Sequence, residues 1–168
     1  DLVEEGFDLA IRIGAIGQQG LVSRRLATTR LVCCAAPAYL ARHAAHPIRV
    51  PADLAAHQCL SYTQVALPNT WRFEGPDGAA HEFRVPPRHR VNNGRMLVAL
   101  AAEGMGVVNE PDFIVNPEIR AGRLVPVLAD FAPPRSTIAA VYPSRRLLST
   151  KVRTFVDFLA QRFAEPAW

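Results

Sequence analysis

The chain has 168 residues, of which 49% are hydrophobic and 20% are charged, a balance typical of a globular domain with a buried core. Its formal net charge of +4 comes from basic residues scattered along the sequence, and the absence of a dense basic run argues against direct DNA binding by this chain. No apolar run reaches the roughly 18 residues of a transmembrane helix, and no signal peptide opens the sequence, so we expect no membrane partner.

The first half of the chain predicts strands that alternate with short helices. Short apolar runs bounded by glycine or polar loops favour strands, and proline in the first turn favours the start of a helix. Strands are expected at residues 7–13, 21–35 and 59–63, and short helices are expected at residues 37–40 and 51–57. The strongest hairpin signal in the chain is Gly75-Pro76-Asp77-Gly78, which stands between two aromatic-containing runs, residues 71–73 and 82–85.

Two helices of the second half have clear start signals. Asn93 is expected to cap a helix that Gly104 ends, and Ser149 is expected to cap the last helix. Apolar residues of that last helix follow helical spacing and predict a core-facing stripe made of Val152, Phe155, Val156, Leu159 and Phe163. Strands are expected at residues 105–108, 123–128 and 137–142, and a further helix is expected to begin at Pro111.

This alternation of strands and helices predicts an α/β fold with mostly parallel sheets flanked by helices, decorated by the antiparallel hairpin. The order of elements also predicts where a ligand would bind, because ligands of parallel sheets bind beyond the carboxyl ends of the strands, beside the starts of helices. Polar or glycine residues in such places are the candidate binding residues Arg12, Gly14, Tyr62, Thr63, Asn93, Gly94 and Asn109. Each has a plainer interpretation; Asn93, for instance, can be a helix cap only.

Motifs of catalysis and of cofactor binding are absent. The sequence has no nucleophile elbow, phosphate-binding loop, zinc-protease motif or complete dinucleotide-binding motif. His43 and His46 have a spacing that a metal could use, but no third ligand is near in sequence, so we expect solvent-exposed loop histidines. Glu110 and Asp112 stand at an expected helix start, where carboxylates complement the helix dipole. We therefore expect no catalytic group, no metal and no cofactor.

Three cysteines, Cys33, Cys34 and Cys59, form no CxxC pair and are odd in number, which indicates neither a disulfide framework nor a zinc site. A reducing cytoplasm fits this usage best. Cys33 and Cys34 are adjacent in an apolar run, so they are expected to point to opposite faces of a strand as small hydrophobic side chains. A redox sensor is the alternative interpretation.

Several segments in order resemble the regulatory domain of LysR-type bacterial transcriptional regulators. They are Asp1 to Gly14, Ala36 to Leu40, Pro51 to His57, Val91 to Gly94, Ala121 to Leu128 and Val141 to Arg146. Together they span almost the whole chain, which makes the resemblance more specific than any single motif.

The resemblance implies a two-lobed, periplasmic-binding-protein-like fold of type 2. The chain would cross between lobes near residues 29–32 and 136–139, so that lobe one holds residues 1–31 and 137–168 and lobe two holds residues 32–136. Thr29 joins the candidate binding residues because it lies at the first crossing. A small effector bound in the cleft would shift the relation of the lobes and, through a homodimer or homotetramer, the spacing of the DNA-binding heads.

Two departures from the family pattern affect this interpretation. The winged helix-turn-helix and the first strand and helix of lobe one have no counterpart in this sequence, which begins with Asp1 rather than methionine, so the chain is expected to be a fragment with an exposed, strand-pairing edge. The second departure is Asn109-Glu110, which stands before Pro111 where the family usually has an apolar pair. These two polar side chains are expected either to alter effector preference or to face solvent.

The resemblance therefore predicts a cytoplasmic effector-sensing domain that is not an enzyme, with promoter DNA bound only through the absent N-terminal domain. Arg12 and the amides after Asn93 favour an organic anion as effector. A stand-alone periplasmic solute-binding protein is the main alternative, because it shares the plan of the two lobes. An enzyme on this fold would need activated side chains in the cleft, and the sequence offers none.

Overall fold

The extended segment expected at residues 21–35 forms two consecutive strands, β2 (Leu21–Thr29) and β3 (Leu31–Ala35), which meet at Arg30. In this computed structural model the chain divides at the same point into two compact units. The first unit is made of Asp1–Thr29 and Arg135–Trp168, and the second unit is Arg30–Pro134. The described residues are 2, 6–14, 20–63, 69–86, 89–131, 133, 135–144 and 149–164. Residues 1, 3–5 and 145–146, which take part in the resemblance, lie outside them.

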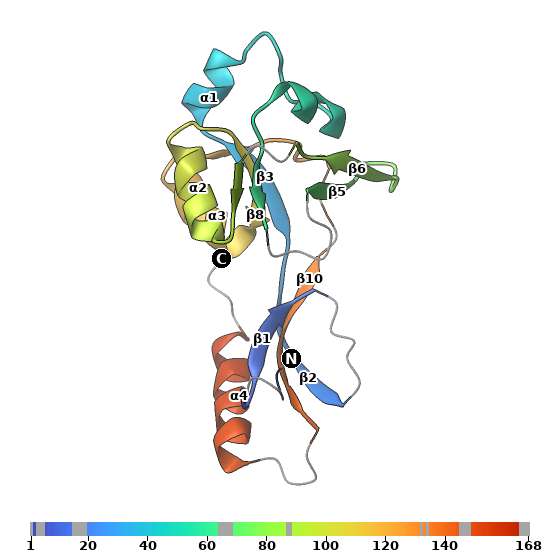
Figure 1. Ribbon diagram of the computed structural model, residues 1–168, viewed down its shortest axis with the longest axis vertical. Helices are drawn as coiled ribbons and strands as arrows, with labels where there is room; N and C mark the ends of the chain where they lie inside the picture. The colour runs from blue at the N-terminus through green and yellow to red at the C-terminus, as the bar shows by residue number, and fades with distance from the viewer. Residues whose placement is uncertain are drawn as a thin grey trace. The chain divides into compact units, whose positions relative to one another are not determined.

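The first unit contains a three-stranded sheet in the order β1-β10-β2, and every pairing in it is antiparallel. β10 (Ser136–Pro143) is the central strand, and β1 (Ala10–Ile13) and β2 pair along its two sides (Figure 1). The last helix, α4 (Thr150–Arg162), begins as predicted at Ser149, whose Oγ accepts a hydrogen bond from the Val152 amide at 3.3 Å.

The stripe predicted on α4 is only partly correct. Val152 and Val156 are buried against Leu26 and Ala140 of the sheet, and Leu159 and Phe163 pack against this cluster in part. Phe155 is wrong as a core residue, because 46% of it is exposed. The spacing placed it on the apolar side of the helix, but no described element of this unit covers it. Sequence spacing defines a helix face, whereas burial also requires a partner for that face.

The second unit has a sheet in which β3 lies between β8 (Val107–Pro111) and the short β9 (Val125–Pro126), both antiparallel to it. A parallel pair, β4 (Leu60–Tyr62) and β7 (His89–Val91), continues this sheet through the parallel bridge between Cys59 and Val107. The sheet of the first unit is therefore antiparallel and that of the second unit is mixed, so the prediction of mostly parallel sheets was wrong. β10 pairs with β2 and runs in the opposite direction to it. β8 likewise runs in the opposite direction to its partner β3.

Helices cover one face of this second sheet and the hairpin lies toward the other. Figure 1 shows α2 (Gly94–Ala102) and α3 (Asp112–Arg120) side by side, and both contact β3 and β8. The remaining elements are the predicted hairpin, β5 (Thr70–Glu74) with β6 (Ala80–Arg84), and two short helices, α1 (Pro37–Arg42) and the 3-10 helix η1 (Pro51–Ala56).

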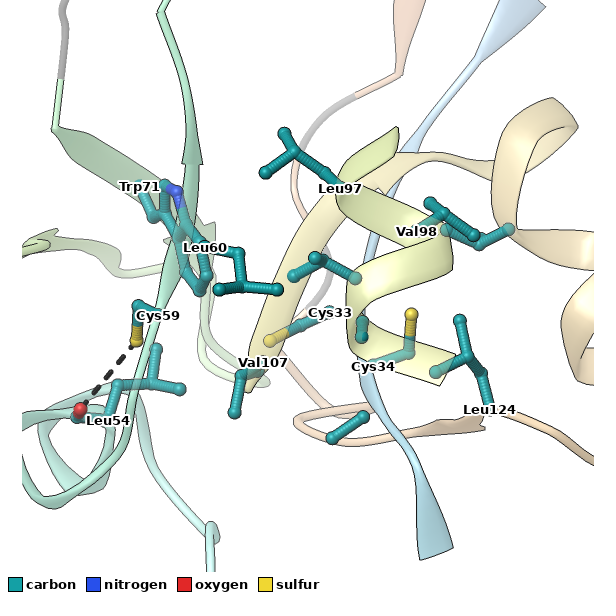
Figure 2. Packing of buried hydrophobic residues seen from close by; sticks show 14 of the residues in the cluster. Cys33, Cys34, Leu54, Cys59, Leu60, Trp71, Leu97, Val98, Val107 and Leu124 are labelled. Carbon is teal, nitrogen blue, oxygen red and sulfur yellow. Dashed lines mark hydrogen bonds between the residues drawn. The ribbon is translucent and has the colours of Figure 1, made fainter. Parts of the chain in front are cut away.

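The three cysteines belong to the core of the second unit, and all three are free thiols. Figure 2 shows the Cys33 and Cys34 side chains on opposite sides of β3, as predicted for neighbours on a strand. Burial raises the pKa of Cys34 and of Cys59 to about 12, and it raises the pKa of Cys33 as well. The thiols are therefore protonated near neutral pH, which fits small hydrophobic side chains rather than a reactive redox sensor.

A buried tyrosine and histidine join α1 to the segment after η1. The Tyr39 hydroxyl accepts a hydrogen bond from the Gln58 amide at 2.9 Å and lies 3.2 Å from His57 Nδ1. His57 Nε2 lies 2.8 Å from the His46 carbonyl oxygen, to which it donates. Nδ1 is then the acceptor for the Tyr39 hydroxyl proton, so the network is complete only when His57 is neutral.

We expect this network to make the stability of the domain fall in acid. Burial lowers the pKa of His57 from its usual 6.5, so the unfolded chain takes up the proton more readily than the folded one. The stabilising contribution is complete above pH 6.5 and is lost as the pH falls through the lower folded pKa. Thermal unfolding of the full-length protein should show a steeper loss of melting temperature between neutral and acidic pH than its His57→Gln variant. The His89→Gln variant, which changes an exposed histidine, is the control and should behave as the wild type does. The prediction is wrong if melting temperature depends on pH in the same way in the wild type and in His57→Gln.

Candidate functional site

The parallel strands of the second unit end at one edge of its sheet, and this edge gathers five of the predicted site residues. Tyr62 ends β4 and pairs with Val91, the last residue of β7. The amide of Thr63 then donates to the Val91 carbonyl at 3.1 Å. β8 is parallel to β4 through the Cys59–Val107 bridge, so its end reaches the same edge. Tyr62, Thr63, Asn93 and Gly94 therefore lie at this edge, and Asn109 lies on β8 shortly before its end. That these residues bind an effector stays a prediction.

Asn93 forms the N-cap of α2, as the plainer interpretation had it. Its Oδ1 accepts a hydrogen bond from the Met96 amide at 3.1 Å, and its carbonyl accepts from Leu97. The following residue, Gly94, is the first residue of the helix. Among the described residues no partner is found for the amides of Gly94 and Arg95, which are two of the free donors at a helix start. This helix start can therefore hold a hydrogen-bond acceptor.

Asn109 is buried, and its amide has no partner. The sequence placed it after a strand, but it lies inside β8, opposite Cys33 on β3, and only 7% of it is exposed. Neither Nδ2 nor Oδ1 has a hydrogen-bond partner among the described residues. A buried polar group left without a partner costs about 1–3 kcal/mol, and native proteins contain few of them. Asn109 is thus suited to bind a polar group that enters the site.

Glu110, the next residue, was not among the predicted site residues. It is only 4% exposed. Of the two alternatives that the sequence left open for Asn109 and Glu110, solvent exposure is therefore wrong for both, and an effect on effector preference stays a prediction. Burial raises the pKa of the Glu110 carboxyl to about 7. The signal was present in the sequence, because the pair replaces apolar residues of the family pattern, but β8 was predicted to end before it.

Gly94 and Glu110 lie in close contact. A Cβ on Gly94 would stand 2.7 Å from Glu110 Oε2, closer than real Cβ atoms approach such an atom. The absence of a side chain at Gly94 therefore lets the carboxyl lie directly against the first turn of α2.

Arg12, Gly14 and Thr29 form a separate group in the first unit. Arg12 pairs with Ala139 in the β1–β10 ladder, and the amide of Gly14 donates to the Thr137 carbonyl at 3.0 Å. Thr29 pairs with Ser136 at the first residue of β10 and is buried. All three lie at one end of the three-stranded sheet, which is the end where β2 passes into β3.

No group of three or more metal-binding side chains occurs in the part of the chain that the structure describes. His43 is half-buried, stacks on the Tyr39 ring with centroids 4.2 Å apart, and has Nδ1 2.9 Å from the Tyr39 carbonyl oxygen. The expectation of exposed loop histidines is thus correct for His46 and wrong for His43, because Tyr39 covers the His43 ring.

Among the described helices, none is both long enough and apolar enough to cross a membrane.

Comparisons with known proteins bear on this fold and this site. The LysR substrate binding domain family matches residues 1–164. The chain belongs to the LysR family of transcriptional regulators. The HTH-type transcriptional regulator CrgA of Neisseria meningitidis serogroup B is 33% identical over 162 residues, which are 96% of this chain and 53% of that protein. The HTH-type transcriptional regulator DmlR of Escherichia coli K12 is 37% identical over 166 residues, which are 98% of this chain and 53% of that protein.

Solved structures agree with the family. The CrgA regulatory domain from Neisseria meningitidis has a TM-score of 0.82 and 32% identity, covering 96% of this chain and 78% of that one. The chain is thus a LysR effector-binding domain with the type 2 periplasmic-binding-protein-like α/β fold, and it spans about half the length of its relatives CrgA and DmlR, at 53% of each. The family consists of transcriptional regulators, so neither the enzyme nor the stand-alone solute-binding protein is retained.

We expect Asn109→Leu to stabilise the ligand-free protein. The substitution removes a buried amide without partners and replaces it with an apolar side chain of similar size, so the gain should be about 1–3 kcal/mol. Urea unfolding of the full-length protein measures it, and Asn116→Leu on α3 is the matched control, because Asn116 is only half-buried. A loss of stability in Asn109→Leu would mean that the amide has a partner in the folded protein.

Proposed function

We propose that this LysR domain senses a small-molecule effector that binds at the edge where β4, β7 and β8 end. The observation that carries the proposal is the buried Asn109 amide, whose donor and acceptor both lack partners among the described residues. An effector with a polar group would supply these hydrogen bonds and remove the cost of the unpartnered amide. Tyr62 and Thr63, half-buried at the end of β4, would add a phenol and a hydroxyl at the same edge of the sheet.

The effector is an organic acid in this proposal, and it would extend across the edge of the sheet, because the Asn109 side chain lies on the face opposite to Glu110 and α2. The free amides of Gly94 and Arg95 at the start of α2 favour a carboxylate or another anionic acceptor. Arg12, Gly14 and Thr29 of the first unit remain predicted site residues.

The two units correspond in this proposal to the two lobes of the domain, with residues 1–31 and 137–168 in lobe one and residues 32–136 in lobe two. An effector with unequal affinity for two arrangements of the lobes shifts their populations, which is what sensing requires. The full-length protein would act in the cytoplasm as a homodimer or homotetramer, and a helix-turn-helix outside this chain would bind promoter DNA. The names of CrgA and DmlR as HTH-type regulators support that last point.

A thermal-shift screen of the full-length protein against small organic acids tests the proposal. An effector should raise the melting temperature in proportion to the logarithm of its concentration, because it binds the folded protein only. Asn109→Leu should abolish or strongly weaken that rise, while Asn116→Leu should keep it. If organic acids bind the wild type and Asn109→Leu equally well, the proposed site is wrong. If no small molecule raises the melting temperature, the sensing function itself is wrong.

A further inference from the structure

Glu110 is a buried acid without a counter-charge. It is 4% exposed, and no described residue forms an ion pair or a hydrogen bond with its carboxyl. Its neighbour across the β3–β8 ladder is Val32, which offers no polar side chain. A desolvated carboxyl without a partner is unfavourable, and proteins retain such groups mainly where they bind something.

The position of this carboxyl is set by α2. Its Oε2 lies against Gly94, where a Cβ would meet it at 2.7 Å, and the Ile114 side chain closes the same side at 3.1 Å from that Cβ position. The Met96 amide is already used by Asn93, and the amides of Gly94 and Arg95 have no partner among the residues that the structure describes. A negative acceptor and two free donors therefore stand next to each other at the start of one helix.

These neighbours constrain the effector. Above about pH 7 the Glu110 carboxyl is ionised despite its raised pKa. A plain carboxylate that approached the amides of Gly94 and Arg95 would then meet a like charge in a poorly solvated place, which is costly. A molecule that carries an ammonium group beside its carboxylate satisfies both partners at once. We propose that Glu110 accepts the ammonium group of the effector while the first amides of α2 bind its carboxylate, so the effector is an α-amino acid or a similar zwitterion.

This inference rests on the proposed function and narrows its substrate class. Binding gives the Glu110 carboxyl the counter-charge that the described residues do not supply, and a charge-assisted hydrogen bond is stronger than a neutral one. The site would then select against acids that lack the amine, because they leave the carboxyl unpaired and repelled.

Matched pairs of small molecules that differ only in the α-amino group test this inference. Suitable pairs are glycine and acetate, L-alanine and propionate, L-aspartate and succinate, and L-phenylalanine and 3-phenylpropionate. Affinities are measured by calorimetry with the full-length protein, its Glu110→Gln variant, and Glu103→Gln as the control. Glu103 is an exposed acid at the C-terminal end of α2, so its substitution removes the same charge from the other end of the helix.

We expect the amine-bearing member of at least one pair to bind the wild type about tenfold tighter than its partner. Glu110→Gln should remove this preference, and Glu103→Gln should keep it. Glu110→Gln removes a buried charge while keeping the shape of the side chain, so it is expected to fold, and its melting temperature without ligand confirms this. The inference is overturned if the amine-free acid binds as tightly as its partner, or if Glu110→Gln keeps the preference.

The same experiment separates this inference from the proposed function. If an amine-free acid binds as tightly as its partner and Asn109→Leu abolishes its binding, the proposed sensing site is supported and only the role of Glu110 is wrong. If no member of any pair binds, the proposed sensing site and the role of Glu110 are both wrong.

Discussion

The antiparallel ladder between β3 and β8 is the constraint on which the candidate site depends. Five residue pairs, from Leu31–Pro111 to Ala35–Val107, fix the register of β8 against the strand that enters the second unit. Since side chains alternate along a strand, this register places Asn109 and Cys33 on one face of the sheet. Glu110 lies on the other face, toward α2. A shift by one residue would exchange the two faces and separate Glu110 from Gly94. The amide of Asp112 continues the constraint, because it donates to the Arg30 carbonyl at 2.9 Å.

The second unit places two polar side chains in a strand that is otherwise buried and apolar. Val107 and Val108 are completely buried, and Asn109 and Glu110 are nearly so. Apolar residues in place of Asn109 and Glu110 would give a more stable sheet, since neither polar group has a partner in the described residues. Proteins commonly accept such a loss of stability where a site must be polar before its ligand arrives. The same reasoning does not extend to His57, whose two ring nitrogens both have partners.

Local signals predicted much of this structure. The caps Asn93 and Ser149 and the hairpin at residues 75–78 depend on a few neighbouring residues, and the structure confirms all three. The directions of the strands depend on how the chain returns after the crossing, which no short pattern records, and the prediction of mostly parallel sheets failed for that reason. Phe155 failed similarly, because its burial requires a partner outside the helix.

The place of the candidate site was predictable from the sequence, but the burial of its side chains was not. Its edge followed from the order of strands and helices, since the carboxyl ends of β4 and β7 meet wherever those strands pair in parallel. The burial of Glu110 was not predictable, because a Glu beside Asn and Pro is ordinarily solvated. Only the length of β8 and the absence of a side chain at Gly94 bring its carboxyl against α2.

Burial acts on His57 and Glu110 in opposite directions, and this affects how the pH dependence of the domain is understood. Stability linked to His57 increases as the pH rises to 6.5, because its folded pKa is lowered. Stability linked to Glu110 is complete below its ordinary pKa of 4.5 and is lost as the pH rises through about 7, because its folded pKa is raised. Between these values the two contributions offset each other. A flat stability profile of the wild type would therefore conceal two titrations, and only a variant that removes one of the groups separates them.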